Sequence, residues 1–301
     1  MINGGLLRDA VISAAHSISN KKKSVDELNV FPVPDGDTGT NMSMTITNSV
    51  AELENLSDDA DCSVVASTTA SALLRGARGN SGVILSLIFR GFAKGLAGKK
   101  EMGANELVES LEQGVSGAYK SVMKPTEGTI LTVARESAEK AREMLHSTND
   151  PIIIMEEVCK QAELSLNETP KLLPALAKAG VVDAGGQGWM FVLEGALSYL
   201  KSGNVVERQG EALEMQTAPV KKKSQEAIKT EDIKFKYCTE FIVEKKQKGL
   251  SVSTFRDTIA PKGDCMLVID DDEIVKVHIH TNHPGFVLEE AIKLGEMINL
   301  K

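Results

Sequence analysis

Hydrophobic residues recur at helical spacing through the first two hundred positions of the chain. Apolar side chains three and four residues apart occupy the segments 6–15, 64–73, 83–88, 107–115, 128–145, 152–166 and 186–200. Clusters of Ser, Thr, Asn, Asp, Gly and Pro separate these segments, as expected where helices start and stop. Together with a helix that begins near Thr38, the pattern predicts about eight helices with short connections, forming an all-α domain over residues 1–203.

The pattern changes after Ser202. Residues 204–230 are polar, include three consecutive lysines at 221–223 and contain few large apolar side chains, which is typical of a linker. Apolar and polar residues then alternate over 233–243, which predicts a strand. The runs 266–269 and 273–280, on either side of an acidic turn, predict a hairpin, and helical spacing returns over 286–300. Residues 231–301 are therefore expected to form a small α+β domain.

Composition narrows the classes of function. Lys and Arg total 34 against 42 Asp and Glu, a net charge of −8, and aromatic residues are only 4%. Neither the basic face nor the stacking platform of a nucleic-acid-binding protein is indicated. The apolar runs are shorter than the roughly 18 residues of a membrane helix, and residues 1–20 contain no secretory signal core. Four widely spaced cysteines indicate a reducing compartment, so we expect a cytoplasmic protein without disulfides.

The densest group of chemically useful residues is the segment NVFPVPDGDTGTNM at 29–42. Two prolines oppose helix and two glycines free the backbone, so the carboxylates of Asp35 and Asp37 can converge in a loop. Oxygen ligands on such a loop suit Mg²⁺ that also binds substrate phosphates, and a helix starting near Thr38 would point free N–H groups at an anion. On this motif alone, a turn with an aspartate as helix N-cap is the commoner case, and that alternative stays open.

Three more polar or glycine-rich turns precede predicted helices. They are RGARGNSG at 75–82, PTEGT at 125–129 and DAGGQG at 183–188. Backbone amides together with Ser81 would cradle a phosphate, although a helix–helix turn capped by Asn80 explains the first of these turns equally well. Because four such turns fit at one end of a helical bundle, we expect them to surround a nucleotide. The sequence contains neither a Walker pattern nor a Rossmann fingerprint after a strand.

A second group of candidate ligands lies in the small domain. His278 and His280 alternate with valine and isoleucine, so the two imidazoles share the face opposite the apolar one. Cys238 lies on the corresponding face of the earlier strand. If the strands are neighbours, one thiolate and two imidazoles form a Zn²⁺ site with a fourth position for water, His283 or a carboxylate. A surface pair of histidines beside an unpaired thiol is the alternative.

In this order, the four motifs resemble the ATP-binding domain of L-type dihydroxyacetone kinases, in the version found in the fatty acid kinase A subunit of Gram-positive bacteria. The segments KYCTEF and VKVHIHTNHPG are similar to the middle domain of that family. The resemblance implies an eight-helix barrel that holds ADP or ATP with two Mg²⁺ ions. It also implies phosphorylation of a fatty acid, presented by a separate DegV-family fatty-acid-binding protein, to an acyl phosphate for phospholipid synthesis.

The resemblance assigns roles to individual residues. Asp35 and Asp37 match magnesium-binding aspartates of the catalytic centre, and Asn29 stands near the place of a third metal ligand. The residues that match a zinc site of the middle domain are Cys238, His278 and His280. Nucleotide contacts are expected at Thr40, Asn41, Met42, Asn80, Ser81, Gly82, Gly128, Thr129, Asp183 and Gly185.

The resemblance implies a further C-terminal domain that binds the partner, and we expect that domain to lie beyond these 301 residues. We therefore expect the chain to bind nucleotide and to turn over fatty acid poorly. Two alternatives stay open: a kinase for dihydroxyacetone or a small polyol, and a regulatory module that binds nucleotide or zinc without catalysis. Because a domain of about 70 residues with a small sheet has a small core, we also expect a homodimer formed through the second domain.

Overall fold

The computed structural model describes residues 1–209 and 234–301 and divides into two compact units, 1–208 and 209–301. Residues 204–209 are irregular, and the rest of the predicted linker lies outside the described residues. Each unit has its own secondary structure and its own buried interior.

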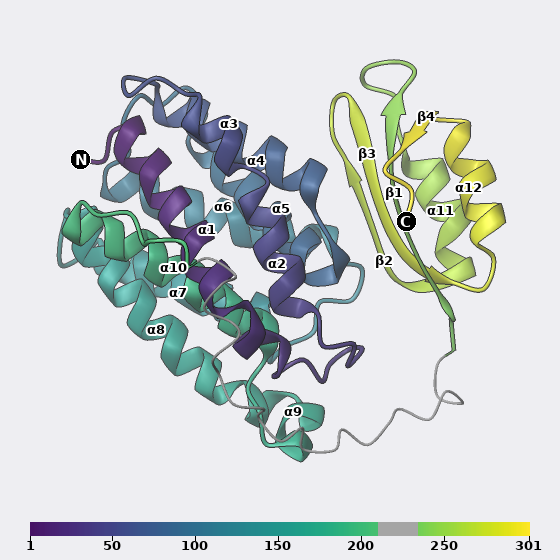
Figure 1. Ribbon diagram of the computed structural model, residues 1–301, viewed down its shortest axis with the longest axis horizontal. Helices are drawn as coiled ribbons and strands as arrows, with labels where there is room; N and C mark the ends of the chain where they lie inside the picture. The colour runs from purple at the N-terminus through teal and green to yellow at the C-terminus, as the bar shows by residue number, and fades with distance from the viewer. Residues whose placement is uncertain (210–233) are drawn as a thin grey trace. The chain divides into compact units, whose positions relative to one another are not determined.

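The named elements of the first unit are all helices within the described residues (Figure 1). Its helices are α1 (Gly4–Asp26), α2 (Thr38–Thr47), α3 (Val50–Glu54), α4 (Cys62–Gly76), α5 (Gly79–Gly95), α6 (Ala104–Ser121), α7 (Ile130–Met144), α8 (Pro151–Leu172), α9 (Pro174–Ala179) and α10 (Ala184–Ser202). Within this unit, eight helices have ten or more residues, while α3 and α9 are single short turns of helix. The predicted all-α fold is confirmed.

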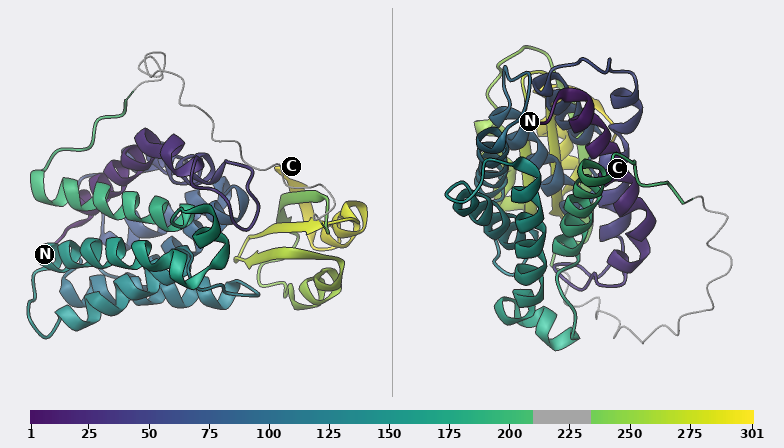
Figure 2. Two further views of the ribbon diagram at one scale, coloured as in Figure 1. Left: turned by 90° about the horizontal axis from the view of Figure 1, so that it is seen from below. Right: turned by 90° about the vertical axis from the view of Figure 1, so that its left-hand side faces the viewer.

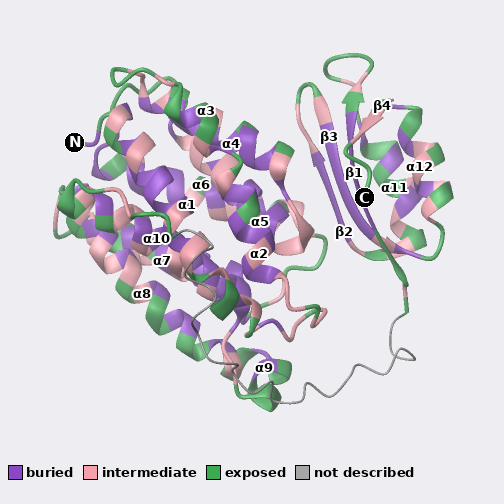
Figure 3. Cartoon of the chain, in the orientation of Figure 1, coloured by how far each residue is buried: buried purple, intermediate pink, exposed green. Residues whose placement is uncertain are grey.

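Small residues allow the helices to pack closely around a buried interior (Figure 3). A Cβ atom on Gly39 in α2 would lie 2.1 Å from the carbonyl oxygen of Lys22 in α1. A Cβ atom on Gly195 in α10 would lie 2.6 Å from the side chain of Ser17, also in α1. These approaches place α2 and α10 directly against α1, at distances that a larger side chain would prevent.

Consecutive long helices of the bundle run in opposite directions (Figure 2). The connections 27–37, 77–78, 122–129 and 173–183 therefore lie at one end of the bundle, and α2, α5, α7 and α10 begin there. Each of the four polar turns predicted from the sequence overlaps one of these connections and continues into the first turn of the helix that follows or ends directly before it. The architecture thus assembles the expected nucleotide loops from segments that are up to about 150 residues apart in sequence.

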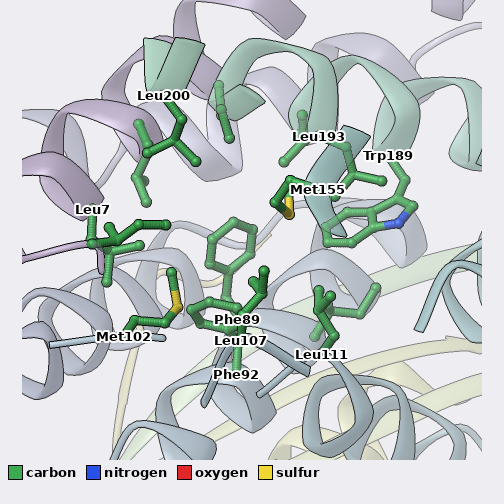
Figure 4. A pocket seen from close by; sticks show the side chains of 17 residues that line it. Leu7, Phe89, Phe92, Met102, Leu107, Leu111, Met155, Trp189, Leu193 and Leu200 are labelled. Atoms are coloured by element: carbon green, nitrogen blue, oxygen red, sulfur yellow. The ribbon is translucent and has the colours of Figure 1, made fainter. Parts of the chain in front are cut away.

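An apolar cavity of about 80 Å³ lies within the bundle, toward the opposite end (Figure 4). Ile2 and Met102, which precede α1 and α6, line it together with Leu7, Phe89, Leu107, Met155 and Trp189. Because its lining carries apolar side chains, this cavity does not suit a nucleotide. No helix among the described residues combines the length and the apolar character needed to cross a membrane.

The second unit contains one antiparallel sheet, two α-helices and one short 3-10 helix (Ala260–Lys262) within its described part. The elements are β1 (Tyr237–Lys245), α11 (Ser253–Ile259), β2 (Gly263–Asp270), β3 (Ile274–Thr281), α12 (Pro284–Ile292) and β4 (Gly295–Ile298), and the strand order is β2-β3-β1-β4. Phe255 and Ile259 of α11 and Val287 of α12 pack on Val275 and Val277 of the sheet. The helices therefore cover one face, and the predicted small α+β domain is confirmed.

The C-terminal helix is shorter than the helical spacing over 286–300 predicts. Helix α12 ends at Ile292, and residues 295–298 form β4, which pairs with β1. Gly295 makes this pairing feasible, because an added Cβ atom would lie 1.8 Å from the carbonyl oxygen of Glu244. The backbone hydrogen bonds available at the edge of β1 prevail here over a short apolar pattern that fits helix or strand.

Candidate nucleotide and metal sites

Asp35 and Asp37 lie in the connection between α1 and α2. Partial burial of its carboxyl group, and then the negative charge of Asp37, raise the pKa of Asp35 to about 6. The two carboxyl groups are close enough to interact directly, as expected from the sequence. Two like charges held together in this way are stabilised by a divalent cation, which would remove their mutual repulsion.

Asn29 organises this loop. Its Nδ2 atom donates hydrogen bonds to Asp35 Oδ1 at 2.7 Å and to the carbonyl oxygen of Val33 at 3.0 Å. Its Oδ1 atom accepts a hydrogen bond from Thr38 Oγ1 at 2.6 Å, and the side chain is buried. Both ends of the amide are thus used to position Asp35 and the start of α2. A direct bond from Asn29 to Mg²⁺ stays a prediction.

The first turn of α2 is held by Asp26, a residue that sequence reasoning missed. Its carboxylate accepts hydrogen bonds from the backbone N–H of Thr40 at 2.9 Å and from Thr40 Oγ1 at 2.7 Å. An acidic residue at the C-terminal end of a helix is unfavourable for that helix, and this was the available signal. Asp26 lies at the end of α1 and serves α2 instead, so the hydroxyl of Thr40 is engaged within the protein.

The second loop lies directly against α2. A Cβ atom on Gly82 would lie 2.3 Å from Thr45 Oγ1, and one on Gly79 would lie 2.5 Å from Asn41 Nδ2. Gly79 also has a φ angle of 56°, a conformation that favours glycine. The side chains in the first turn of α5 that are half-buried are Asn80 and Ser81. The first and second motifs are therefore brought together, as expected.

The third and fourth loops meet at Asp183. Its Oδ2 atom accepts a hydrogen bond from Gly186 N at 2.7 Å and caps α10, while the N–H groups of Ile130 and Gly185 also face the carboxylate. Burial raises its pKa to about 6, although these N–H groups oppose the shift. Asp183 thus joins the starts of α7 and α10 from a buried position. Its predicted contact with the nucleotide has a structural alternative, the capping of these helices.

Thr129 and Gly128 form the turn before α7. Thr129 is the N-cap residue, its Oγ1 atom donates to the carbonyl oxygen of Thr126 at 2.7 Å, and Gly128 has a φ angle of 80°. Met42, by contrast, is fully buried and packs on Gly188 of α10, where an added Cβ atom would lie 2.6 Å from Met42 Sδ. The structure therefore makes Met42 a core residue of α2, and its predicted contact with the nucleotide stays a prediction.

The four helix starts create a positive end of the bundle. The first N–H groups of an α-helix lack partners within the helix and carry partial positive charge, so each start favours an anion. Asp183 already accepts from N–H groups at the starts of α7 and α10. The starts of α2 and α5, at the same end of the bundle as Asp35 and Asp37, are therefore the better placed donors for phosphate oxygens, next to oxygen ligands for a divalent cation. This arrangement suits a nucleotide polyphosphate bound with Mg²⁺.

The candidate zinc ligands also converge. One ligand atom each from Cys238, His278 and His280 lies within 4.8 Å of the others. Cys238 is opposite His280 in the register of β1 and β3, so the strand adjacency assumed from the sequence is correct. His278 is buried, and its Nε2 atom has no hydrogen-bond partner among the described residues. The alternative of a surface pair of histidines is therefore wrong for His278.

Glu240 orients His278 from the adjacent strand. Its Oε2 atom lies 3.2 Å from His278 Nδ1, and its Oε1 atom accepts a hydrogen bond from Lys276 Nζ at 2.9 Å. Burial alone would raise the pKa of Glu240, but the hydrogen bond with His278 and the charge of Lys276 lower it to about 2. A charged carboxylate at Nδ1 favours the tautomer in which Nε2 carries the lone pair needed by a metal.

Two family models match the chain. Residues 32–198 match the DAK2 domain, and residues 234–301 match the middle domain of FakA-like fatty acid kinase proteins. The chain belongs to the DAK2 domain family. Its second unit is correspondingly a middle domain of the FakA-like type.

This DAK2 chain has close relatives. It is 47% identical over 304 residues to an uncharacterized protein of Staphylococcus epidermidis and 44% identical over 304 residues to Protein YloV of Bacillus subtilis. Both alignments include 100% of the chain, but 54% and 55% of the relatives. The chain therefore spans about half the length of the curated relatives it matches.

Among solved structures, the dihydroxyacetone kinase of C. freundii, in complex with AMP-PNP and Mg²⁺, is similar to this chain with a TM-score of 0.50. The alignment covers 64% of this chain and 33% of that kinase at 16% sequence identity. At this identity, the similarity supports the fold of the DAK2 domain, in agreement with the eight long helices.

Proposed function

We propose that this chain is a subunit of an ATP- and Mg²⁺-dependent kinase that phosphorylates a fatty acyl carboxylate presented by a separate DegV-family fatty-acid-binding protein. The observation that carries the proposal is the pair of interacting carboxylates, Asp35 and Asp37, at the end of the bundle where four helices begin. The DAK2 and middle-domain matches support a kinase-type subunit. The fatty acid as acceptor and the DegV-family protein as partner extend the proposal beyond a kinase-type subunit.

Asp35 and Asp37 fit Mg²⁺, since burial and then the charge of Asp37 raise the pKa of Asp35 and a divalent cation would offset both effects. We propose that they hold two Mg²⁺ ions with the nucleotide phosphates and that Asn29 keeps Asp35 in place. Bound Mg²⁺ supplies positive charge at the phosphate oxygens. The N–H groups at the starts of α2 and α5 bind phosphate oxygens from the protein side.

The reaction places few chemical demands on the protein. A carboxylate oxygen of the fatty acid attacks the γ-phosphorus, and the bond between that phosphorus and the bridging oxygen breaks as ADP leaves with the electron pair. A free carboxylic acid is already ionised at about pH 7, so no strong general base is required. The contribution of this chain is to bind and orient the nucleotide and to stabilise the charge of the transferred group.

In the second unit, we propose that Cys238, His278 and His280 hold Zn²⁺. The clustered donor atoms, the choice of one thiol with two imidazoles, and the buried Nε2 atom of His278 without a partner among the described residues support this assignment. Bound Zn²⁺ would join β1 to β3 through its ligands. We further propose that the protein is cytoplasmic. We also propose that it forms a homodimer through this unit, and sedimentation of the chain with and without residues 234–301 would test the dimer.

ATP consumption tests the proposal directly. The assay compares a fatty-acid-loaded partner, dihydroxyacetone and no acceptor, with both this chain and a chain extended to the length of its relatives. We expect ATP consumption and an acyl phosphate only with the loaded partner, and more with the longer chain. Consumption with dihydroxyacetone would favour the small-polyol kinase. Nucleotide binding without consumption under every condition would favour a regulatory module.

A further inference from the structure

Strand β2 contains an irregularity beside the candidate zinc ligands. Asp264 pairs with His280 on β3, but the next pair is Leu267 with His278, so β2 has one more residue than β3 between the two pairs. Cys265 lies in this bulge with a φ angle of 47°, a left-handed conformation that residues other than glycine rarely adopt. Strained backbone conformations of this kind cluster at functional sites of proteins.

The bulge changes the face to which Cys265 belongs. Asp264 shares the face of its partner His280, so regular alternation would put Cys265 on the opposite face, which α11 and α12 cover. Instead, Met266 packs in that covered core. The ligand atoms of Asp264, Cys265 and His280 lie within 4.8 Å of one another. The sulfur of Cys265 therefore lies on the side of the sheet that carries the histidines.

His280 lies between two groups of donors. On one side it pairs with Cys238 of β1, and on the other with Asp264 of β2, the residue before Cys265. It thus belongs both to the cluster with Cys238 and His278 and to the cluster with Asp264 and Cys265. The two thiols thus belong to separate groups that share the imidazole of His280, and a single ion bound by both thiols would draw the two groups together at that imidazole.

We propose that Cys265 is the fourth ligand of the zinc ion, which gives a closed site of two thiolates and two imidazoles formed by Cys238, Cys265, His278 and His280. This proposal rests on the proposed zinc site and adds its fourth position. Two thiolates with two imidazoles form a standard tetrahedral set for Zn²⁺ and suit Mg²⁺ poorly. A site with four protein ligands leaves no open position for water, as in zinc sites that stabilise a fold.

Asp264 then has a role beside the ion. Its Oδ1 atom lies 3.8 Å from His280 Nδ1, just as Glu240 Oε2 lies 3.2 Å from His278 Nδ1. Each imidazole therefore has a carboxylate near Nδ1, which leaves its Nε2 atom for the metal. Asp264 is exposed, whereas Cys265 is partly buried, and this favours the thiol as the direct ligand. Glu240 is within hydrogen-bond distance of His278, whereas Asp264 lies beyond that distance from His280 and acts on it through its charge.

X-ray absorption at the zinc edge counts the sulfur ligands and tests the proposal. The 301-residue chain, loaded with one equivalent of Zn²⁺ under reducing conditions, should show two sulfur and two nitrogen ligands. Cys265→Ser should show one sulfur. Cys159→Ser, which changes a cysteine in α8, should keep two. Zinc bound through one sulfur in the unchanged chain would refute the fourth ligand and leave the proposed site standing. A chain that takes up no Zn²⁺ would refute both.

The substitution Cys265→Gly tests whether Cys265 binds the zinc ion or only adopts the backbone conformation of the bulge. Glycine adopts the left-handed conformation without strain, so the metal-free variant should unfold at the same temperature as the unchanged chain or higher. Its affinity for Zn²⁺, measured by competition with a chelator, should fall by at least about tenfold. An unchanged affinity in this variant would show that Cys265 serves the backbone alone.

Discussion

At the scale of single residues, the carboxylates of Asp35 and Asp37 lie close together, and a bound cation would offset their mutual repulsion. The pKa of Asp35 is raised to about 6, so the folded metal-free chain binds a proton more readily at this group than the unfolded chain does. Its stability must therefore fall as the pH rises through the range from about 4 to about 6, and the loss persists above it. Bound Mg²⁺ reverses this loss by pairing with both carboxylates.

Asp35→Asn should accordingly separate the effect of this carboxylate on stability from its effect on Mg-ATP binding. Without metal, the variant should unfold at a higher temperature than the unchanged chain at about pH 7.5, because the repulsion with Asp37 is gone. With Mg-ATP, it should gain little, whereas the unchanged chain gains stability from binding. Thermal unfolding at about pH 5 and about pH 7.5, with and without Mg-ATP, measures both. Asp257→Asn, which changes an exposed residue of α11, is the control and should alter neither.

The buried network of Glu240, Lys276 and His278 should contribute to the stability of the second unit in a way that depends on pH. Glu240→Gln removes the carboxylate charge that accepts a hydrogen bond from the buried ammonium group of Lys276, which should cost about 3 kcal/mol of unfolding free energy. Because the pKa of Glu240 is lowered to about 2, the network should stabilise the protein above about pH 4.5 and lose this effect as the pH falls toward 2. Denaturant unfolding of the second unit at about pH 7 and about pH 3 would show it.

A matched control is Glu290→Gln, which removes a carboxylate paired with Lys293 at the C-terminal end of α12. That pair lies near the surface, so its loss should cost less than about 1 kcal/mol. Equal effects of the two substitutions would mean that the buried network contributes no more than a surface ion pair. Nitrogen chemical shifts of His278 add an independent observation, since they report which ring nitrogen carries the proton.

Some residues of the site were readable from the sequence and others were not. Asp35 and Asp37 were found because their motif is local. Asp26 and Glu240 were missed because their partners Thr40 and His278 lie 14 and 38 residues away, and only the packed structure makes these pairs visible. Met42 was assigned to the nucleotide because it belongs to the first motif, whereas its position in α2 directs it into the core.

At the scale of elements, the nucleotide end depends on how closely the helices approach one another. Gly82→Ala would add a Cβ atom 2.3 Å from Thr45 Oγ1 and force α5 away from α2. We expect a loss of about 1–3 kcal/mol in unfolding free energy and a clear fall in affinity for Mg-ATP. Gly117→Ala is the control, since its Cβ atom would meet α5 at 3.7 Å, an ordinary contact.

The control substitution Gly117→Ala, in the interior of α6, should stabilise the chain by about 0.5–1 kcal/mol, because alanine is a better helix former than glycine. Denaturant unfolding and nucleotide titration of both variants measure the comparison. If Gly82→Ala bound Mg-ATP as tightly as the unchanged chain, the start of α5 would have no part in the site.

The long helices were predictable because their apolar spacing persists over several turns. The end of α12 was not, since the apolar residues over 286–300 fit a helix up to Ile292 and a strand after Gly295. What decides between them is the open edge of β1, an element that lies far earlier in the chain. The bulge at Cys265 is a second such feature, because its register exists only once β2 and β3 have paired.

At the scale of the whole molecule, the chain consists of two compact units with separate cores. The proposed nucleotide ligands all belong to the first unit, and the proposed zinc ligands belong to the second. A fragment of residues 1–208 should therefore bind Mg-ATP with an affinity within about twofold of the whole chain, since no contact to the nucleotide is lost. Titration of the fragment and of the chain would check this, and a much weaker fragment would mean that the second unit contributes to nucleotide binding.

The central claim is that the end of the bundle where α2, α5, α7 and α10 begin binds a nucleotide through Mg²⁺ held by Asp35 and Asp37. Calorimetric titration of the chain with ATP, with and without Mg²⁺, tests it most directly, together with the double variant Asp35→Asn/Asp37→Asn. We predict one nucleotide per chain, binding that depends on Mg²⁺, and an affinity at least about a hundredfold lower in the double variant, as expected when both charged metal ligands are removed. Equal affinity of the double variant and the unchanged chain would contradict the claim and leave these aspartates without a part in nucleotide binding.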